Sequence, residues 1–468
     1  MRMLSRFGPA AAAVIGLWSA ILPGALSAAD RAELIEDAAD ARIRAVEVEL
    51  SVTGKLHPEP AAEKALKLAV EARFEYSERR RPAEGREAQA LRSVRHYQEA
   101  RASIQAGQQL SNVELRNPLR LIVARGEPEG VELFSPSGPL TYAELELLHV
   151  AGDSLALLAL LPEGAVEPDE SWTVRSWSLP LLTGIEAVEK GTVTCKLETL
   201  RSQSARIDFS GEVNGATLGA AAAVRVNGHL VYDREQKLVT HMELTQSEQR
   251  SIGAVSPGLD VVAKAKLTRL VIERPVRLTD TDLANVPLEP NAASRLLLFD
   301  PPGWNLRLYH DRRWHVFQQT SEAALLRLLD KGGLIAQCNI KKLPDAGPGK
   351  HTSEEQFRED IAQTLGKSFE QFVQSETLKL KEGLYVHRVV AVGAVERRNS
   401  KDEIETSPLQ WIYYLVANPE GRQASFVFTL DPQQAEKLDG ADLAMVTGIE
   451  FLLPRAKPTP TANRRKGK

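Results

Sequence analysis

Long stretches of this chain alternate between apolar and polar residues. In the clearest stretch, residues 66–76, apolar side chains fill every second position, and all but one of the intervening positions are charged. Successive side chains of a strand point to opposite faces, so the pattern predicts a long strand with one apolar and one wet face. Residues 46–52 alternate in the same way, and the Pro-containing segment 57–60 between the two runs predicts a hairpin. A period of two restricts the chain to sheets with one covered face.

The same pattern continues through the first 275 residues, with few helical segments. Residues 92–109 fit either a further long strand or a helix. Thr141 followed by Glu144 predicts a capped helix over 141–150. A short acidic helix is expected over 30–42. The further expected strands are 119–124, 131–134, 155–161, 193–200, 205–213, 222–226, 230–232, 238–244 and 261–267.

A change in the pattern of apolar and polar residues near residue 275 divides the chain into two parts. Pro275, Pro287 and Pro290 stand among polar residues and predict a linker over 276–294. Beyond it, apolar residues at helical spacing predict a helix over 353–373, and another is expected over 432–446. The expected strands of this part are 384–392, 410–417 and 423–430.

The sequence therefore predicts an α+β protein. Residues 30–275 are expected to form a curved, half-barrel-like antiparallel sheet with few helices. Residues 295–453 are expected to form an α/β/α sandwich around an antiparallel sheet. The Pro- and Lys/Arg-rich tail 454–468 has almost nothing apolar to bury and predicts disorder.

The first 29 residues predict an export signal. Arg2 and Arg6 precede an apolar run, and Ser27-Ala28-Ala29 offers the small residues that signal peptidase needs. The expected location is the periplasm or another part of the bacterial cell envelope. The two cysteines, Cys195 and Cys338, lie in alternating apolar segments, which favours two buried thiols.

Two resemblances add to this interpretation. Residues 296–453, with Phe299-Asp300-Pro301-Pro302-Gly303-Trp304 and Arg313-Trp314, resemble the PsbP-like α/β/α sandwich, which implies a binding or assembly module without a catalytic set. Residues 45–273, with the hairpin 45–76 and the strands of 192–267, are similar to LolA-like exported half-barrel proteins. That resemblance implies a concave apolar face, which in relatives holds a lipid.

No catalytic motif is present in the sequence. A GxSxG elbow and a Walker A sequence are both missing. His229 and His241 can meet across the hairpin 230–244, but a third metal ligand is not evident. Arg79-Arg80-Arg81 and Arg464-Arg465-Lys466 lack the interleaved aromatics of a nucleic-acid platform, and the net charge is only −4. We therefore expect no enzyme activity, cofactor, metal or nucleic-acid partner.

The expected function is that of an exported, non-enzymatic binding protein that holds a lipid or apolar ligand on the concave face of its sheet. The alternative is an envelope assembly module acting through protein–protein contacts, and an unrecognised hydrolase is the third. A covering helix would make the apolar stripe dry core, and an open cleft would make it a ligand site. The candidate ligand-binding residues are Leu66, Leu68, Val70, Phe74 and Tyr76.

Overall fold

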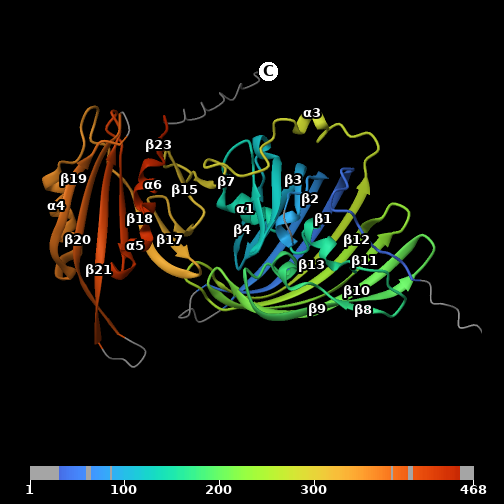
Figure 1. Cartoon of the computed structure of the whole chain (residues 1–468). Coiled ribbons are helices and arrows are strands. Elements are labelled where there is room, and N and C mark those ends of the chain that lie inside the picture. The colour runs from blue at the N-terminus through green and yellow to red at the C-terminus, as the bar shows by residue number, and fades with distance from the viewer. Residues whose placement is uncertain (1–30, 59–64, 85–86, 381–382, 399–403, 454–468) are drawn as a thin grey trace, which may run out of the picture.

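A large curved antiparallel sheet dominates the first part of the molecule (Figure 1). The computed structural model describes residues 31–58, 65–84, 87–380, 383–398 and 404–453. The sheet has twelve strands in the order β6-β5-β3-β2-β1-β13-β12-β11-β10-β9-β8, with β4 paired to β3. Its strands are β1 (Ile43–His57), β2 (Leu66–Arg80), β3 (Arg92–Ala106), β4 (Gln109–Glu114), β5 (Leu121–Glu127), β6 (Gly130–Phe134), β8 (Ser171–Thr173), β9 (Ala187–Leu200), β10 (Ser204–Thr217), β11 (Ala220–Asp233), β12 (Leu238–Arg250) and β13 (Gly258–Val271).

The alternation in the sequence is the cause of this sheet. In β1 the side chains of Val46 and Val48 are 1% exposed, and those of Glu47 and Glu49 between them face solvent. β1 and β2 pair along their length as the expected hairpin. Residues 92–106 form a strand, which settles the alternative at that segment, and the two short strands expected over 222–232 are one strand, β11. The expected α+β fold class, with its curved antiparallel sheet, is confirmed.

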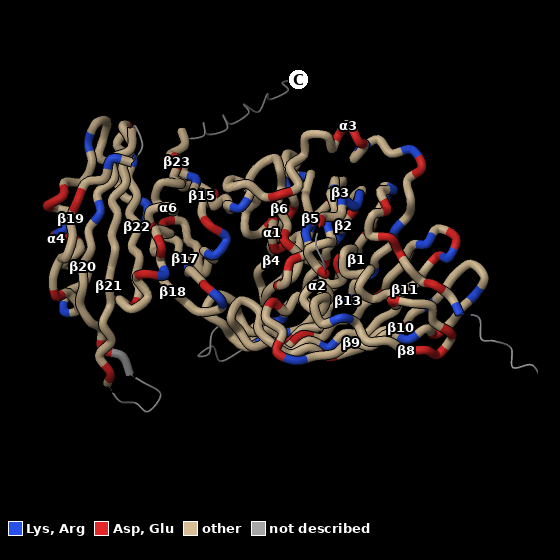
Figure 2. Tube along the Cα trace, in the orientation of Figure 1, with Lys and Arg blue, Asp and Glu red and all other residues tan. Residues whose placement is uncertain are grey.

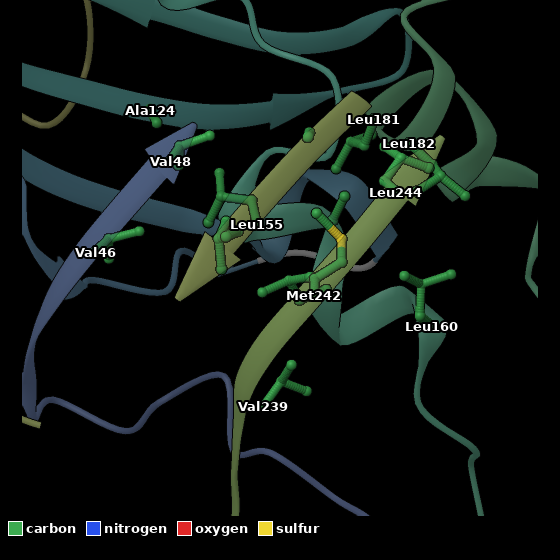
Figure 3. Close-up of a cluster of buried hydrophobic side chains, with 14 of the residues drawn as sticks. Val46, Val48, Ala124, Leu155, Leu160, Leu181, Leu182, Val239, Met242 and Leu244 are labelled. Carbon is green, nitrogen blue, oxygen red and sulfur yellow. The ribbon is translucent and has the colours of Figure 1, made fainter. Parts of the chain in front are cut away.

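Short helices from the segment between β6 and β9 fill the concave side of the sheet. Figure 3 shows Leu155 and Leu160 of one of them beside Met242 and Leu244 of β12. Gly152 permits this approach, because a Cβ there would lie 2.4 Å from the Met242 methyl carbon. The helices of the first part are α1 (Tyr142–Leu148), α2 (Leu179–Thr183) and the 3₁₀ turns η1 (Glu87–Ala90), η2 (Asn117–Leu119), η3 (Ser154–Leu160) and η4 (Ser176–Ser178).

Two expected elements of this part are wrong and one is confirmed. The described residues of 30–42 form no helix, because Asp37 and Asp40 accept hydrogen bonds from nearby backbone N–H groups and stabilise turns instead. Residues 155–161 form η3 rather than a strand, since Asp153 caps a helical turn at Leu155. The capping box that opens α1 is present as expected.

The segment 276–294 lies against the first part. Its short helix α3 (Asp280–Leu283) begins at Thr279, and Leu278 and Leu283 are 2% and 4% exposed in a small cluster with Ile43 of β1 and Val94 of β3. The domain boundaries at 275 and 295 stay a prediction. A four-stranded sheet then joins the two parts, in the order β23 (Ile449–Phe451), β15 (Leu306–Asp311), β14 (Leu296–Phe299) and β7 (Leu140–Thr141).

The second part is a seven-stranded antiparallel sheet between two helical layers. Phe357 and Ile361 of α4 (Glu354–Leu365) pack on one face, and Leu438 of α5 (Ala435–Leu438) and Met445 of α6 (Ala441–Thr447) pack on the other. The sheet order is β16 (Trp314–Gln319), β17 (Ala323–Asp330), β18 (Gly333–Leu343), β22 (Gln423–Leu430), β21 (Ile404–Ala417), β20 (Tyr385–Arg398) and β19 (Phe369–Leu378). The two thiols, in β9 and β18, are buried and unbridged.

Both long helices expected in this part are shorter in the structure. The helix expected over 353–373 ends at Leu365, because Gly366 at φ 52° stops it, and Phe369–Leu378 continues as β19 after the turn η5 (Gly366–Ser368). The helix expected over 432–446 is divided into η6 (Pro432–Gln434), α5 and α6 by Asp439 and Gly440, which both have positive φ. The expected export signal, residues 1–29, and the expected basic tail, residues 454–468, lie outside the described residues.

Candidate functional site

The five candidate residues of β2 share one face of the strand but differ in how far they are covered. Phe74 and Tyr76 are 2% and 4% exposed, and Leu68 is 8% exposed. Val70 is half-buried, and Leu66 is 38% exposed. The structure therefore closes one end of the stripe as dry core and leaves the other end partly open.

A buried polar layer closes the Tyr76 end. Arg95 of β3 lies 5.4 Å from the Tyr76 ring centre and donates to Glu78 and, through both terminal nitrogens, to Asp153. Glu78 also accepts from Ser154, at 2.6 Å. Burial alone would raise the pKa of Glu78, but Arg95 and Ser154 outweigh it and lower the pKa to about 2. The carboxylate therefore stays ionised inside the fold.

A second buried cluster adjoins this layer. Glu36 is 5% exposed. Its carboxylate accepts hydrogen bonds from Arg80, from Arg269 and from the backbone N–H of Val239. Burial opposes its ionisation, but the charges of Arg269 and Arg80 hold the pKa of Glu36 below its usual value. Arg44, fully buried, pairs with Asp40 at 2.5 Å. These ion pairs separate the apolar interior from solvent at this end.

The sequence contains a signal for this layer that the prediction did not use. Arg44 in β1 occupies the same alternating face as Val46, and Glu78 and Arg80 in β2 occupy the same face as Tyr76. Charged residues at positions where the period of two requires burial are expected to find partners inside the fold. The partners Glu36 and Asp153 come from non-strand segments and could not be assigned from the pattern.

The Leu66 end of the concave face has an apolar floor that the chain covers only in part. Half-buried side chains from four adjacent strands lie there, and they contact the main core on one side. They are Leu50, Val70, Ala72, Ile104 and Val113. Among the described residues, no buried ion pair like the one beside Tyr76 covers these side chains. The arrangement can accept an apolar group.

A trough of about 920 Å³ crosses six strands, β4, β3, β2, β1, β13 and β12. Each strand contributes three consecutive residues, and eight of the eighteen are charged, among them Glu49, Arg73 and Lys266. The middle residue of each group of three, such as Leu50 of β1 and Ala72 of β2, belongs to the apolar face of its strand, and the two flanking residues belong to the polar face. Figure 2 shows Lys, Arg, Asp and Glu positions along the strands of this sheet, and the trough gathers eight of them. None of the five candidate residues lines this trough, although Leu50, Ala72 and Val113 of the apolar floor do.

A serine, a histidine and a carboxylate meet in the second part of the molecule. His387 of β20 is fully buried, with Nε2 3.3 Å from the Ser375 hydroxyl and Nδ1 3.0 Å from the Thr377 hydroxyl. Thr377 in turn donates to Glu354 at the start of α4, at 2.6 Å. Burial lowers the pKa of His387, which keeps the ring neutral. A threonine hydroxyl thus stands between imidazole and carboxylate, and the network ties α4 to β19 and β20.

Comparisons with known proteins give distant structural likenesses only. No family model matches the chain, and no curated protein matches it. Lipovitellin, in a structure concerned with lipid–protein interactions, is 11% identical with a TM-score of 0.27, over 55% of this chain and 27% of lipovitellin. The chain thus spans about a quarter of lipovitellin's length.

Two outer-membrane structures are similarly distant. OccK11 of Pseudomonas aeruginosa is 8% identical with a TM-score of 0.13, over 86% of this chain and 98% of OccK11. The translocator domain of the autotransporter NalP from Neisseria meningitidis is 7% identical with a TM-score of 0.12, over 83% and 87% of the two chains. The resemblances to PsbP-like and LolA-like proteins receive no support. TM-scores this low leave function to be argued from the chain itself.

Proposed function

We propose that this protein is an exported, non-enzymatic binding protein of the bacterial cell envelope, and that it holds a lipid or similar apolar ligand at the Leu66 end of its concave sheet. Export rests on the sequence pattern of residues 1–29. In the described part of the chain, no helix is both long and apolar enough to cross a membrane.

The observation that carries the proposal is the uneven cover of the stripe along β2, where Leu68 is 8% exposed but Val70 is half-buried and Leu66 is exposed. The stripe is 2–4% exposed at Phe74 and Tyr76, where the chain fills its own interior, and 38% exposed at Leu66. Covering a large apolar side chain contributes about 1.5–3 kcal/mol. A ligand with a hydrocarbon chain would gain this free energy by completing the cover that the protein leaves unfinished.

Two substitutions on the same face of β2 test the proposal. Val70→Asp places a carboxylate in the half-open floor, so the protein should fold and lose uptake of a fluorescent fatty acid. Phe74→Asp buries an unpaired charge in dry core and should unfold the domain. Lys67→Asp, on the solvent-facing side of the same strand, is the matched control and should leave both properties unchanged.

Native mass spectrometry of protein purified from the envelope supplies an independent measurement. Co-purified lipid that is absent from the Val70→Asp variant would support the proposal. A Val70→Asp variant that folds and takes up the fatty acid as the wild type does would contradict it, as would unfolding of this variant, which would make Val70 dry core.

A second candidate function, an assembly module, is favoured by one edge of the seven-stranded sheet. β19 is the last strand in that sheet, and Val373 on it is 54% exposed. An edge strand offers unpaired backbone groups to which a partner strand can add. Val373→Pro would block such pairing, so loss of a co-purifying envelope protein with fatty-acid uptake intact would favour this function.

A further inference from the structure

Two histidines and a glutamate meet on the solvent-facing side of the large sheet. His229 lies in β11, directly opposite Glu243 in β12, and His241 precedes Glu243 by two residues. Residues two apart in a strand share a face, and opposite residues have Cβ atoms about 4.5–5.5 Å apart. The register thus adds Glu243 to the two histidines that the sequence predicted could meet.

The donor atoms of these residues are close enough to share one ion. One nitrogen from each imidazole and one Glu243 oxygen all lie within 4.8 Å of one another. The imidazole ring centres are 5.9 Å apart, and His241 Nε2 is 3.4 Å from Glu243 Oε1. Ligands at about 2.0–2.2 Å from one ion lie at most about 4.4 Å apart, so small side-chain rotations would bring these atoms onto one ion.

The site is open to solvent on one side. Both imidazoles are half-buried, and the Glu243 side chain is 54% exposed. Burial, followed by the positive charge of Arg206, lowers the pKa of His229. A neutral imidazole has a free lone pair, so this ring is ready to bind a cation near neutral pH.

The charged neighbours set limits on the affinity. Asp208 of β10 lies opposite His229 and adds a carboxylate, although Arg206 donates to it at 2.8 Å. Lys266 of β13 lies opposite Glu243 and opposes a cation, and Thr268 opposite His241 is neutral. The two negative charges of Glu243 and Asp208 and the two positive charges of Arg206 and Lys266 largely cancel. The imidazole nitrogens therefore determine which ion binds.

We propose that His229, His241 and Glu243 form a binding site for a divalent transition-metal ion of the Zn²⁺ or Cu²⁺ class. Imidazole nitrogen suits these ions, whereas Ca²⁺ and Mg²⁺ take oxygen ligands. Three protein ligands leave at least one coordination position for water or for an acidic group of a further ligand. Glu243 also lines the charged trough, so the ion would stand at one end of that trough.

Calorimetric titration of chelator-treated full-length protein with ZnCl₂ and CuCl₂ tests the site. We expect one equivalent to bind, with Cu²⁺ tighter than Zn²⁺. His229→Ala and His241→Ala should each weaken binding by about tenfold or more, which corresponds to about 1.4 kcal/mol. Lowering the pH should weaken binding, because protons compete with the ion for the same lone pairs.

The control is His57→Ala, which removes a half-buried histidine at the far end of β1. The affinity of the His57→Ala variant for Zn²⁺ and Cu²⁺ should equal that of the wild type. Circular dichroism checks that each variant folds, and the electron paramagnetic resonance spectrum of bound Cu²⁺ should show coupling to one nitrogen fewer in His229→Ala. Unchanged one-to-one binding by a His229→Ala/His241→Ala double variant would overturn the site, as would failure of the wild type to bind either ion.

Discussion

Glu36 shows how one side chain from an irregular segment can hold a sheet interior together. Its carboxylate lies between Arg80 of β2 and Arg269 of β13, two strands that both neighbour β1. All three side chains are at most 2% exposed, so water cannot replace a lost partner. The burial of these charges depends on each of them being paired.

Glu36→Gln should therefore destabilise the protein by about 3–5 kcal/mol, because it leaves two buried guanidinium groups without their counter-charge. Urea denaturation followed by circular dichroism measures the change. Asp280→Asn is the matched control: Asp280 pairs with Arg79 but is 89% exposed, and a surface pair contributes about 0–1 kcal/mol. Equal losses in the two variants would contradict the role given to Glu36.

Glu78 predicts how stability depends on pH. Its pKa in the folded protein, about 2, is lower than the ordinary glutamate value of 4.5, so the folded state favours the ionised form. This contribution is fully present above pH 4.5 and is lost as the pH falls towards about 2. Glu78→Gln should lower stability at neutral pH and flatten the acid limb of a plot of unfolding free energy against pH. An unchanged acid limb would show that other groups govern it.

At the scale of elements, η3 is the part of the chain that turns the curved sheet into dry core. Leu155, Leu157 and Leu160 are all at most 1% exposed. Figure 3 places Leu155 and Leu160 among residues of β1, β12 and α2. The element contributes apolar area rather than backbone pairing, so its side chains decide its effect.

Leu157→Ala should cost about 2–5 kcal/mol, because it removes buried methyl groups and leaves a cavity. Leu158→Ala, in the same turn, is the matched control, since Leu158 is only half-buried and should cost less. Thermal unfolding compares the two. A larger effect at Leu158 would show that η3 faces the sheet differently from the arrangement described.

At the scale of the whole molecule, Arg312 connects the two parts. It donates to the backbone carbonyls of Leu133 in β6, Ser294 and Arg295. Tyr142 and His315 stack edge to face nearby, at 5.8 Å between ring centres. The loops at Gly219 and Gly332 form a second contact, where a Cβ on Gly219 would lie 2.0 Å from the Gly332 carbonyl oxygen.

Arg312→Ala should uncouple the two parts, because the part-buried carbonyls of Leu133 and Ser294 and the exposed carbonyl of Arg295 lose their donor, at a cost of about 1–3 kcal/mol at most for each part-buried one. We expect the calorimetric unfolding curve to broaden or split into two transitions. Arg313→Ala is the control, since Arg313 is 43% exposed and pairs only with the neighbouring Asp311. A single unshifted transition in Arg312→Ala would contradict a structural role for this contact.

The strands were predictable because their cause is local. A period of two in residues 46–52 and 66–76 needs no distant information, and Thr141 with Glu144 defines the start of α1 by itself. The sequence pattern also placed the five candidate side chains of β2 on one face. It could not show which of them are covered, since the covering residues come from η3 and α1, far along the chain.

The strand expected over 155–161 and the length of the helix expected over 353–373 were wrong for a related reason. A continuous apolar run suits a buried strand or a buried helical turn equally, and the cap at Asp153 decided for the turn. The helical spacing of Phe357, Ile361 and Leu365 continues into Phe369 by chance, because Gly366 ends α4 before it.

The sequence by itself determined the class of structure, since side-chain alternation dictates sheets with one covered face. Only the tertiary structure decided the chemistry. The partner of Arg80 lies 44 residues away at Glu36, and Glu243 meets His229 through strand register, which sequence spacing alone does not specify. Burial, ion pairing and metal coordination depend on three-dimensional distance, and a one-residue change of register would move every one of these side chains to the opposite face.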